Sequence, residues 1–274
     1  MEVIKNISFS ENCIGLIKYL EENDIKYNKE YFVMDIYESN PHWEQIKKYL
    51  KKYKISYLSE TIFTKKELQS AEWLTVRSVW RYDYPQPFDD RKYETITYTR
   101  ENHCSECGIG LRQVDSFRMK KPPKWNQRHF MIMNWIEDEF FVNDSTRKLL
   151  EKNFDFLKFC DVKNKKGTEI FPDINQMIIP ILEREGIIEE QSYLQNVYLC
   201  SACEKKKYHP SGIGMLKLKR EIFENAPDIV KSAENFGWGC GSDRIIYISQ
   251  KAYQFILSNH LERGLVFEPI DLID

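Results

Sequence analysis

The sequence predicts an α+β protein with mixed sheets, flanking helices and an embedded site made of four cysteines. Hydrophobic residues make up 42% of the 274 positions and charged residues 30%, values that are typical of a chain with a packed core. Segments with the composition of strands and segments with helical periodicity follow one another along the chain. Two cysteine pairs, Cys104-Ser-Glu-Cys107 and Cys200-Ser-Ala-Cys203, interrupt this pattern and supply the third observation.

Charge and cysteine usage restrict the class of protein. The 40 basic and 42 acidic side chains leave a formal charge of −2, which gives no general attraction to nucleic acid or to an anionic membrane. The N-terminal residues lack the basic start and apolar core of a signal peptide, and no apolar run reaches the about 18 residues of a membrane span. Seven cysteines would leave a disulfide scaffold with one over, so we expect a cytoplasmic protein with Cys13, Cys160 and Cys240 as free thiols.

Residues 1–90 are predicted to form an N-terminal α+β part of the order β-α-β-α. Residues 31–37 are aromatic and β-branched, as in a strand, and Asn40-Pro41 resembles a helix start with proline at the first helical position. Residues 55–63 form a second candidate strand, and Thr64 with Glu67 forms a capping box before a second helix. The apolar faces of the two helices are Trp43, Ile46, Leu50 and Tyr53, and then Leu68, Ala71 and Leu74.

Residues 91–274 are predicted to form a second α+β domain, which the turn-rich residues 84–90 connect to the first. Residues 93–99 alternate as a strand and lead into the first cysteine pair, and residues 196–199 lead into the second. Gly108, directly after Cys107, suits a turn that needs a positive φ. The other expected elements are one or two strands in 130–142, a helix from Asp144-Ser145 through Leu150, a helix over 173–185 kinked at Pro180, a strand over 244–248, a helix capped by Ser249 and reaching His260, and a strand over 265–267.

The two cysteine pairs predict a metal site. Two thiolates three positions apart can bind one metal ion from a single turn, and two such turns complete the sulfur tetrahedron of a closed structural zinc site. Residues 108–199 separate the pairs, far more than the roughly 15–20 residues in a compact zinc ribbon. We therefore expect Cys104, Cys107, Cys200 and Cys203 to bind structural Zn²⁺ in a zinc-ribbon-like arrangement that joins distant segments and contributes to folding.

Other uses of these cysteines remain open. The pairs could be metal-free, buried or oxidised, and a redox CxxC is a further alternative. That use requires the pair at a helix start, which Gly108 and Gly110 disfavour. His103 and His209 flank the pairs and could act as ligands, although each is also compatible with an ordinary hydrogen-bonded histidine.

The sequence contains no recognisable catalytic motif. HExxH, the phosphate-binding GxxxxGK[ST] loop and GxSxG are absent, and the residues around both cysteine pairs do not fit the zinc-deaminase pattern. Cys240 lies in a glycine-rich segment, 236–243, where it could be an exposed nucleophile with His209 or His260 as base. The same glycines equally suit a tight loop that packs Phe236 and Trp238 against the core, and no base is placed near Cys240 by spacing. We therefore predict that the protein is not an enzyme.

Residues 117–128 combine basic and aromatic side chains, a composition found in surfaces that bind nucleic acid or another anionic partner. The alternative is a solvated loop whose charge is offset by the acidic run 137–139. The candidate anion-binding residues are Arg118, Lys120, Lys121, Lys124, Trp125 and Arg128, beside the aromatic Phe117.

Taken together, the first pair with Gly108, an aromatic middle that contains Trp135, the second CxxC and a tail ending at Pro269 resemble the double-CXXCG family of bacterial proteins. The resemblance spans residues 93–269. Glu204 follows the second pair in place of glycine, so only the first pair is a full CXXCG. The resemblance implies a non-enzymatic binding protein with zinc as scaffold, because members of the family include immunity proteins against polymorphic toxins.

We therefore expect a bacterial, zinc-stabilised protein that functions by protein–protein interaction, an immunity protein that neutralises a toxin. The alternative is a nucleic-acid-binding zinc-ribbon protein that uses residues 117–128. Neither alternative involves a membrane.

Overall fold

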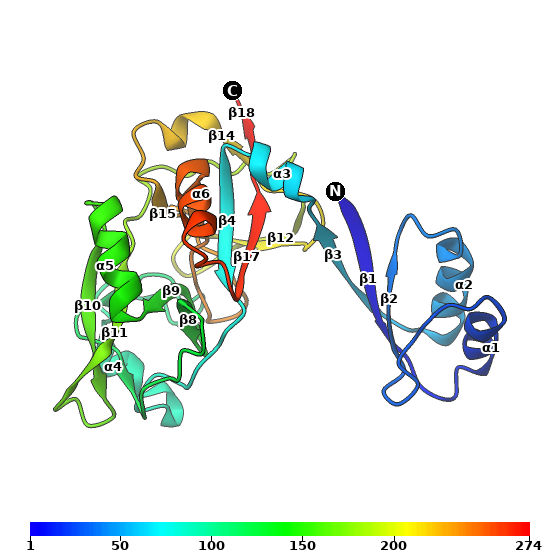
Figure 1. Cartoon of the computed structure of the whole chain (residues 1–274), viewed down its shortest axis with the longest axis horizontal. Coiled ribbons are helices and arrows are strands. Elements are labelled where there is room, and N and C mark those ends of the chain that lie inside the picture. Colours follow the sequence, from blue (N-terminus) through cyan, green and yellow to red (C-terminus); the bar gives the residue numbers. More distant parts are fainter. The chain divides into compact units, whose positions relative to one another are not determined.

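The predicted α+β class is confirmed. The computed structural model describes residues 1–274 and contains six α-helices among mixed sheets (Figure 1). Two compact units are present, one formed by residues 1–67 with 211–214 and the other by 68–210 with 215–274. The domain boundary predicted at residue 90 lies inside the second unit, because residues 68–90 contain a strand that is central to one of its sheets. None of the helices has the length and apolar character needed to span a membrane.

The first unit is a three-stranded antiparallel sheet with two helices packed on one face. β1 (Glu2–Ser8) is the central strand, with β2 (Val33–Tyr37) and β3 (Tyr57–Ile62) on its two sides. α1 (Ile14–Glu22) and α2 (Trp43–Tyr53) contribute their apolar faces to a core with the inward residues of the sheet. That core contains Ile7, Leu16, Leu20, Met34, Ile36, Trp43, Ile46 and Leu50. β2, α2 and β3 match the expected elements, whereas β1 and α1 were not predicted.

The segment 211–214 belongs to the first unit because it continues the hydrogen bonding of β3. The Thr61 amide donates to the Gly212 carbonyl (3.0 Å), and the Gly214 amide donates to the Thr61 hydroxyl (2.7 Å). At the other end of the unit the predicted capping box is present. The Glu67 amide donates to Thr64 Oγ1 (3.2 Å) and the Thr64 amide donates to Glu67 Oε2 (2.8 Å), which starts α3 (Lys65–Ser70).

The second unit contains two larger sheets. The first has the order β15-β16-β4-β17 and is antiparallel throughout, with α6 packed against it. The second has the order β7-β10-β11-β9-β8, in which only the β7–β10 pair is parallel. The bounds in the first sheet are β4 (Trp73–Ser78), β15 (Ile229–Lys231), β16 (Ile246–Ser249), β17 (Leu265–Pro269) and α6 (Gln250–Ser258). Those in the second are β7 (Arg118–Met119), β8 (Phe130–Met133), β9 (Ile136–Val142), β10 (Lys158–Asn164), β11 (Ile170–Ile178) and α5 (Asp144–Asn153), the helix beside it.

One apolar core joins these two sheets and their helices. Leu74 and Val76 of β4 meet Phe130 of β8, Leu150 of α5 and Ile256 of α6 in a single cluster. Both helices begin at the expected places. The Ser249 side chain accepts a hydrogen bond from the Ala252 amide, and the cap of α5 is Asn143, one residue before the predicted start.

Short strand pairs complete the second unit. They are β5 (Tyr98–Thr99) with β6 (Arg112–Gln113), β12 (Leu194–Leu199) with β13 (Lys206–Pro210), and the parallel pair β14 (Lys217–Lys219) with β18 (Asp271–Ile273). Two-stranded pairs of this size have little stability of their own, so they depend on what packs around them. Two of these pairs carry the cysteine turns.

Three sequence-based element predictions are wrong. Residues 93–97 form helix α4 (Tyr93–Thr97) rather than a strand, because Tyr93, Glu94 and Thr97 are buried at helical spacing and Glu94 pairs with Arg91. Residues 173–178 belong to strand β11, which lies between β10 and β9, so the expected helix over 173–185 is absent.

The third error is the second helical face of residues 1–90. α3 ends at Ser70, and Leu74 is instead a fully buried residue of strand β4. A short apolar run does not distinguish a buried strand from a helix, and tertiary pairing decided the outcome at this position.

Candidate metal centre

The structure brings the four cysteines of the two CxxC pairs together. Their sulfur atoms all lie within 4.8 Å of one another, with Sγ–Sγ distances of 3.7 Å between Cys104 and Cys200 and 3.6 Å between Cys107 and Cys203. All four thiols are free, and these distances exceed the about 2.05 Å of a disulfide bond. Cys107 and Cys200 are buried, whereas Cys104 and Cys203 are partly exposed. This cluster could hold a metal ion.

Each cysteine pair occupies the tip of a hairpin. β5 and β6 pair through Thr99 and Arg112 on either side of the first turn, and Leu199 of β12 pairs with Lys206 of β13 around the second. The sequence therefore predicted correctly that β12 leads into its pair. β5 also precedes its pair, but it is much shorter than the strand that was expected there.

The two turns have the same hydrogen bonding. The Gly108 amide donates to the Cys104 carbonyl (2.8 Å), as the Glu204 amide donates to the Cys200 carbonyl (2.9 Å). In each turn the first cysteine amide donates to the carbonyl five positions later, at 2.9 Å in the first turn and 3.0 Å in the second. Gly108 has φ 77° and Glu204 has φ 58°, so both lie in the left-handed region. Glu204 in place of a second glycine therefore adds strain to the second turn but leaves the turn conformation the same.

A buried lysine supports the first turn. Lys207 Nζ donates to the carbonyls of Cys107 (2.8 Å), Gly239 (2.6 Å) and Gly241 (2.9 Å), and the side chain is almost completely buried. Because Lys207 is in β13, it ties the hairpin of the second turn to the first turn and to the 236–243 loop. No pattern in the sequence indicates this role, since residues 205–207 are a run of three lysines that resembles a solvated segment.

The 236–243 loop packs directly on the first turn. A side chain at Gly108 would collide with the backbone carbonyl of Cys240, so a residue without Cβ is required for both its φ and its contact. Cys240 itself is exposed, and its Sγ lies 3.7 Å from Arg91 Nη1. The loop is tight and depends on glycine, as expected, and Phe236 is buried, but the prediction that Trp238 packs against the core is wrong, because its side chain is 56% exposed.

The thiols of this cluster differ in their pKa values. The amides of Cys107 and Glu106 lower the pKa of Cys104 to about 7, whereas burial raises the pKa of Cys107 to about 12. Four thiolates this close repel one another, and a bound dication removes that repulsion while the ligands lose their protons. The donor set therefore fits a metal ion that prefers thiolate ligands.

The flanking histidines do not join the four cysteines. The His209 ring packs against Trp238 in a tilted arrangement, with ring centroids 3.8 Å apart, and burial lowers the pKa of His209. The cysteine cluster contains neither His103 nor His209. His260 follows the end of α6, and no hydrogen bond joins either candidate base to Cys240.

The aromatic side chains of the basic segment 117–128 pack against other parts of the protein. Phe117 is fully buried, and Trp125 packs edge-to-face on Trp80 and donates its indole N–H to the Asp173 carbonyl (3.2 Å). Arg118 pairs with Asp115 at 3.3 Å, and the Arg128 guanidinium lies 5.1 Å from the Trp80 ring centre. The exposed cations of the segment are Lys120, Lys121 and Lys124.

Comparisons with known proteins add no relationship to this description, since no family model, curated protein or solved structure matches the chain.

Replacement of Gly108 by alanine should destabilise the second unit and weaken metal binding. We expect a loss of at least about 3 kcal/mol, because Cβ would add a collision with the Cys240 backbone to the strain of a positive φ. The matched control is Gly239→Ala in the neighbouring loop, where φ is 54° but no atom lies within 4 Å of the added Cβ. Equal unfolding free energies for the two variants would show that the contact has no role.

Replacement of Glu204 by glycine should stabilise the second turn. Glycine removes the cost of a positive φ at this position, and its greater freedom in the unfolded chain offsets part of the gain, leaving about 0.5–1 kcal/mol. Thermal unfolding of the metal-loaded protein measures the effect. A lower melting temperature would mean that the Glu204 side chain itself stabilises the turn.

Proposed function

We propose that Cys104, Cys107, Cys200 and Cys203 bind one structural zinc ion. A tetrahedral Zn²⁺ with Zn–S bonds of about 2.3 Å separates its sulfur ligands by about 3.8 Å. The sulfur pairs at 3.7 and 3.6 Å support this geometry. Four protein ligands leave no coordination position for a substrate or a water molecule, so the ion would stabilise the fold and would not take part in catalysis.

We further propose that the protein acts by binding another protein, as an immunity protein that neutralises a toxin. The resemblance to the double-CXXCG family and the closed cysteine site both favour a binding role over an enzymatic one. Large apolar side chains near the cysteine turns are also exposed, including Leu199 (60% exposed) beside Cys200 and Trp238 (56% exposed) in the loop above Gly108. Exposed apolar and aromatic side chains held by a rigid turn are suited to protein recognition.

The nucleic-acid alternative receives less support. Recognition of single-stranded nucleic acid depends on exposed aromatic rings on which bases stack. In residues 117–128, Phe117 is buried and the Trp125 ring is engaged with Trp80. Three exposed lysines remain there, and the total charge of the protein is slightly negative.

Removal of one ligand should release the metal and unfold much of the second unit. We expect Cys104→Ser and Cys200→Ser to lose stoichiometric zinc, as measured by elemental analysis, together with the cooperative unfolding transition of that unit. The control is Cys240→Ser, which alters an exposed thiol outside the cluster and should keep full zinc content. Full zinc content in either ligand variant would contradict the proposed site.

The binding role is tested by affinity capture from a lysate of the native host, with nuclease present. We expect a protein partner at near-stoichiometric yield, at least tenfold reduced by Leu199→Ser when zinc content is unchanged. Leu58→Ser is the matched control, because Leu58 is also an exposed leucine of a strand (74% exposed) but belongs to the first unit. Recovery of nucleic acid alone without nuclease, and of no protein partner with it, would contradict the proposal.

A further inference from the structure

The second unit contains a cavity of about 1100 Å³ that the sequence did not predict. Both cysteine turns contribute to its wall, the first through residues 108–110 and the second through residues 204–206. Further lining residues come from strands β5, β6, β9, β10, β11 and β15, from helix α4, from the β8–β9 turn and from the 236–243 loop. A cavity of this volume is in the range that binds small organic ligands or a projecting side chain of a partner.

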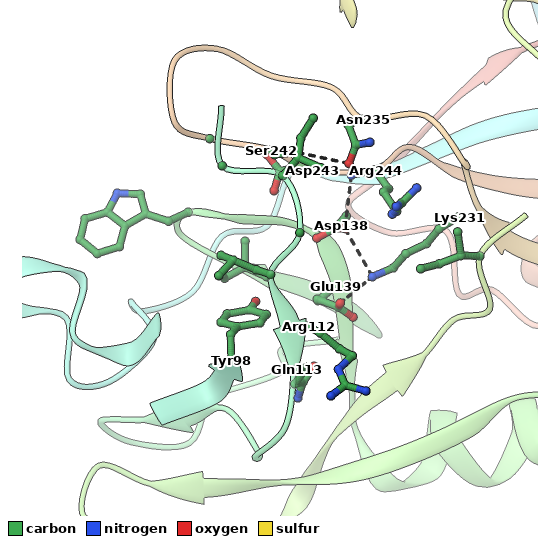
Figure 2. Close-up of a pocket in the computed structure, with 18 of the residues that line it drawn as sticks. Tyr98, Arg112, Gln113, Asp138, Glu139, Lys231, Asn235, Ser242, Asp243 and Arg244 are labelled. Carbon is green, nitrogen blue, oxygen red and sulfur yellow. Dashed lines mark hydrogen bonds and ion pairs between the residues drawn. The ribbon is translucent and has the colours of Figure 1, made fainter. Parts of the chain in front are cut away.

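Three carboxyl groups gather on one side of the cavity (Figure 2). Lys231 Nζ lies 2.5 Å from Glu139 Oε1 and 3.4 Å from Asp138 Oδ2. The lysine and these two carboxylates are largely buried: 6% of the Lys231 side chain is exposed, 14% of Glu139 and 19% of Asp138. The third carboxyl group belongs to Asp243, which forms no ion pair although it also lines the cavity.

The nearby arginine does not balance this charge by direct pairing. Arg244 Nη1 donates to the backbone carbonyls of Ser232 (2.6 Å) and Ala233, and only its backbone amide contacts Asp138 Oδ2, at 3.3 Å. Lys231 is therefore the one side-chain cation in contact with these carboxylates, and it is shared by Asp138 and Glu139. The acidic run 137–139, which the sequence suggested as an offset for the 117–128 segment, instead contributes two of its members to this cavity.

The surroundings of Asp243 disfavour the charged form of its carboxyl group. Burial and the neighbouring Asp138 and Glu137 raise its pKa to about 7, and a hydrogen bond from the Glu137 amide and the charge of Lys231 only partly oppose this. Tyr93 and Tyr98, on α4 and β5, are the other titratable groups that interact with Asp243, and both are neutral at this pH because burial raises their pKa values. A cation placed beside Asp243 would favour its ionised form.

An aromatic wall borders the same cavity. Trp135, in the turn between β8 and β9, has φ 71° and is 42% exposed, although asparagine or glycine is the usual residue at a positive φ in such a turn. Its ring stacks on Tyr93 with centroids 6.1 Å apart. The Arg91 guanidinium lies 6.0 Å from the indole centre, so this ring already contacts a cation. Residues with a strained backbone are concentrated at active sites and ligand-binding sites.

We propose that the cavity binds an organic cation, with an ammonium or guanidinium group at Asp138 and Asp243 and an apolar portion along Tyr93 and Trp135. The ammonium of Lys231 disfavours a bare divalent metal ion at these carboxylates, whereas a hydrogen-bonding organic cation can use the carboxylate oxygens that Lys231 does not contact. The cation is either a free amine or a lysine or arginine side chain of a protein partner. This inference goes beyond the proposed function and does not depend on it.

The test is isothermal titration calorimetry of the metal-loaded full chain at pH 8 with two probes, agmatine and N-acetylarginine amide. At least one probe should bind, and Asp243→Asn and Asp138→Asn should each weaken that binding at least tenfold. Asp155→Asn is the matched control, because Asp155 is exposed and does not line the cavity. Zinc content and near-ultraviolet circular dichroism verify that each variant is folded.

The outcomes separate the two sources of the cation. Tighter binding of N-acetylarginine amide supports a protein-borne side chain, and tighter binding of agmatine supports a free amine. Affinity should also rise about tenfold from pH 6 to pH 8, since the Asp243 carboxyl must lose its proton to hold the cation. Failure of both probes to bind the wild-type chain, equal binding to Asp243→Asn, or binding of Mg²⁺ alone would overturn the proposal.

Discussion

The closure of residues 104–107 onto residues 200–203 is the constraint on which the second unit depends. The two hairpins that carry these turns are short, and β5 and β6 have only two residues each. Strand pairs of this length cannot hold the turns in place alone. A chain of nearly one hundred residues must also close between the pairs, at an entropic cost that a bound metal ion can offset.

The packing around the cysteines extends this constraint to the rest of the site. Lys207 connects the backbone of the first turn with the 236–243 loop, and Gly108 lets that loop approach to direct backbone contact. The same loop carries Asp243 and the same turns line the cavity. Formation of the cysteine centre and formation of the cavity are therefore coupled, because the turns and the loop form walls of both.

The sequence was sufficient for features that depend on local chemistry. The Thr64 capping box, the Ser249 cap and the positive φ of Gly108 each follow from one residue type in its immediate context. The spacing of the cysteines singled out the four thiols that the fold brings within 4.8 Å of one another. These signals need no knowledge of distant partners.

The remaining features depend on tertiary contacts. The alternation of 93–97 resembles a strand, but burial of Tyr93 and pairing of Glu94 made it a helix. Residues 173–178 form part of strand β11 because β10 and β9 pair with it, one on each side. The cavity could not be predicted because Asp138, Lys231 and Asp243 come from separate parts of the chain. The one feature of the sequence that pointed to the cavity was Lys231, a charged residue in the otherwise apolar strand β15.

Zinc K-edge X-ray absorption of the purified full chain is the decisive measurement for the four-cysteine centre, because it reports the identity and distance of the metal ligands. We expect one zinc per chain with four sulfur neighbours at about 2.3 Å and no nitrogen or oxygen ligand. A first shell that contains nitrogen or oxygen, or a folded chain without stoichiometric metal, would contradict a closed four-cysteine centre.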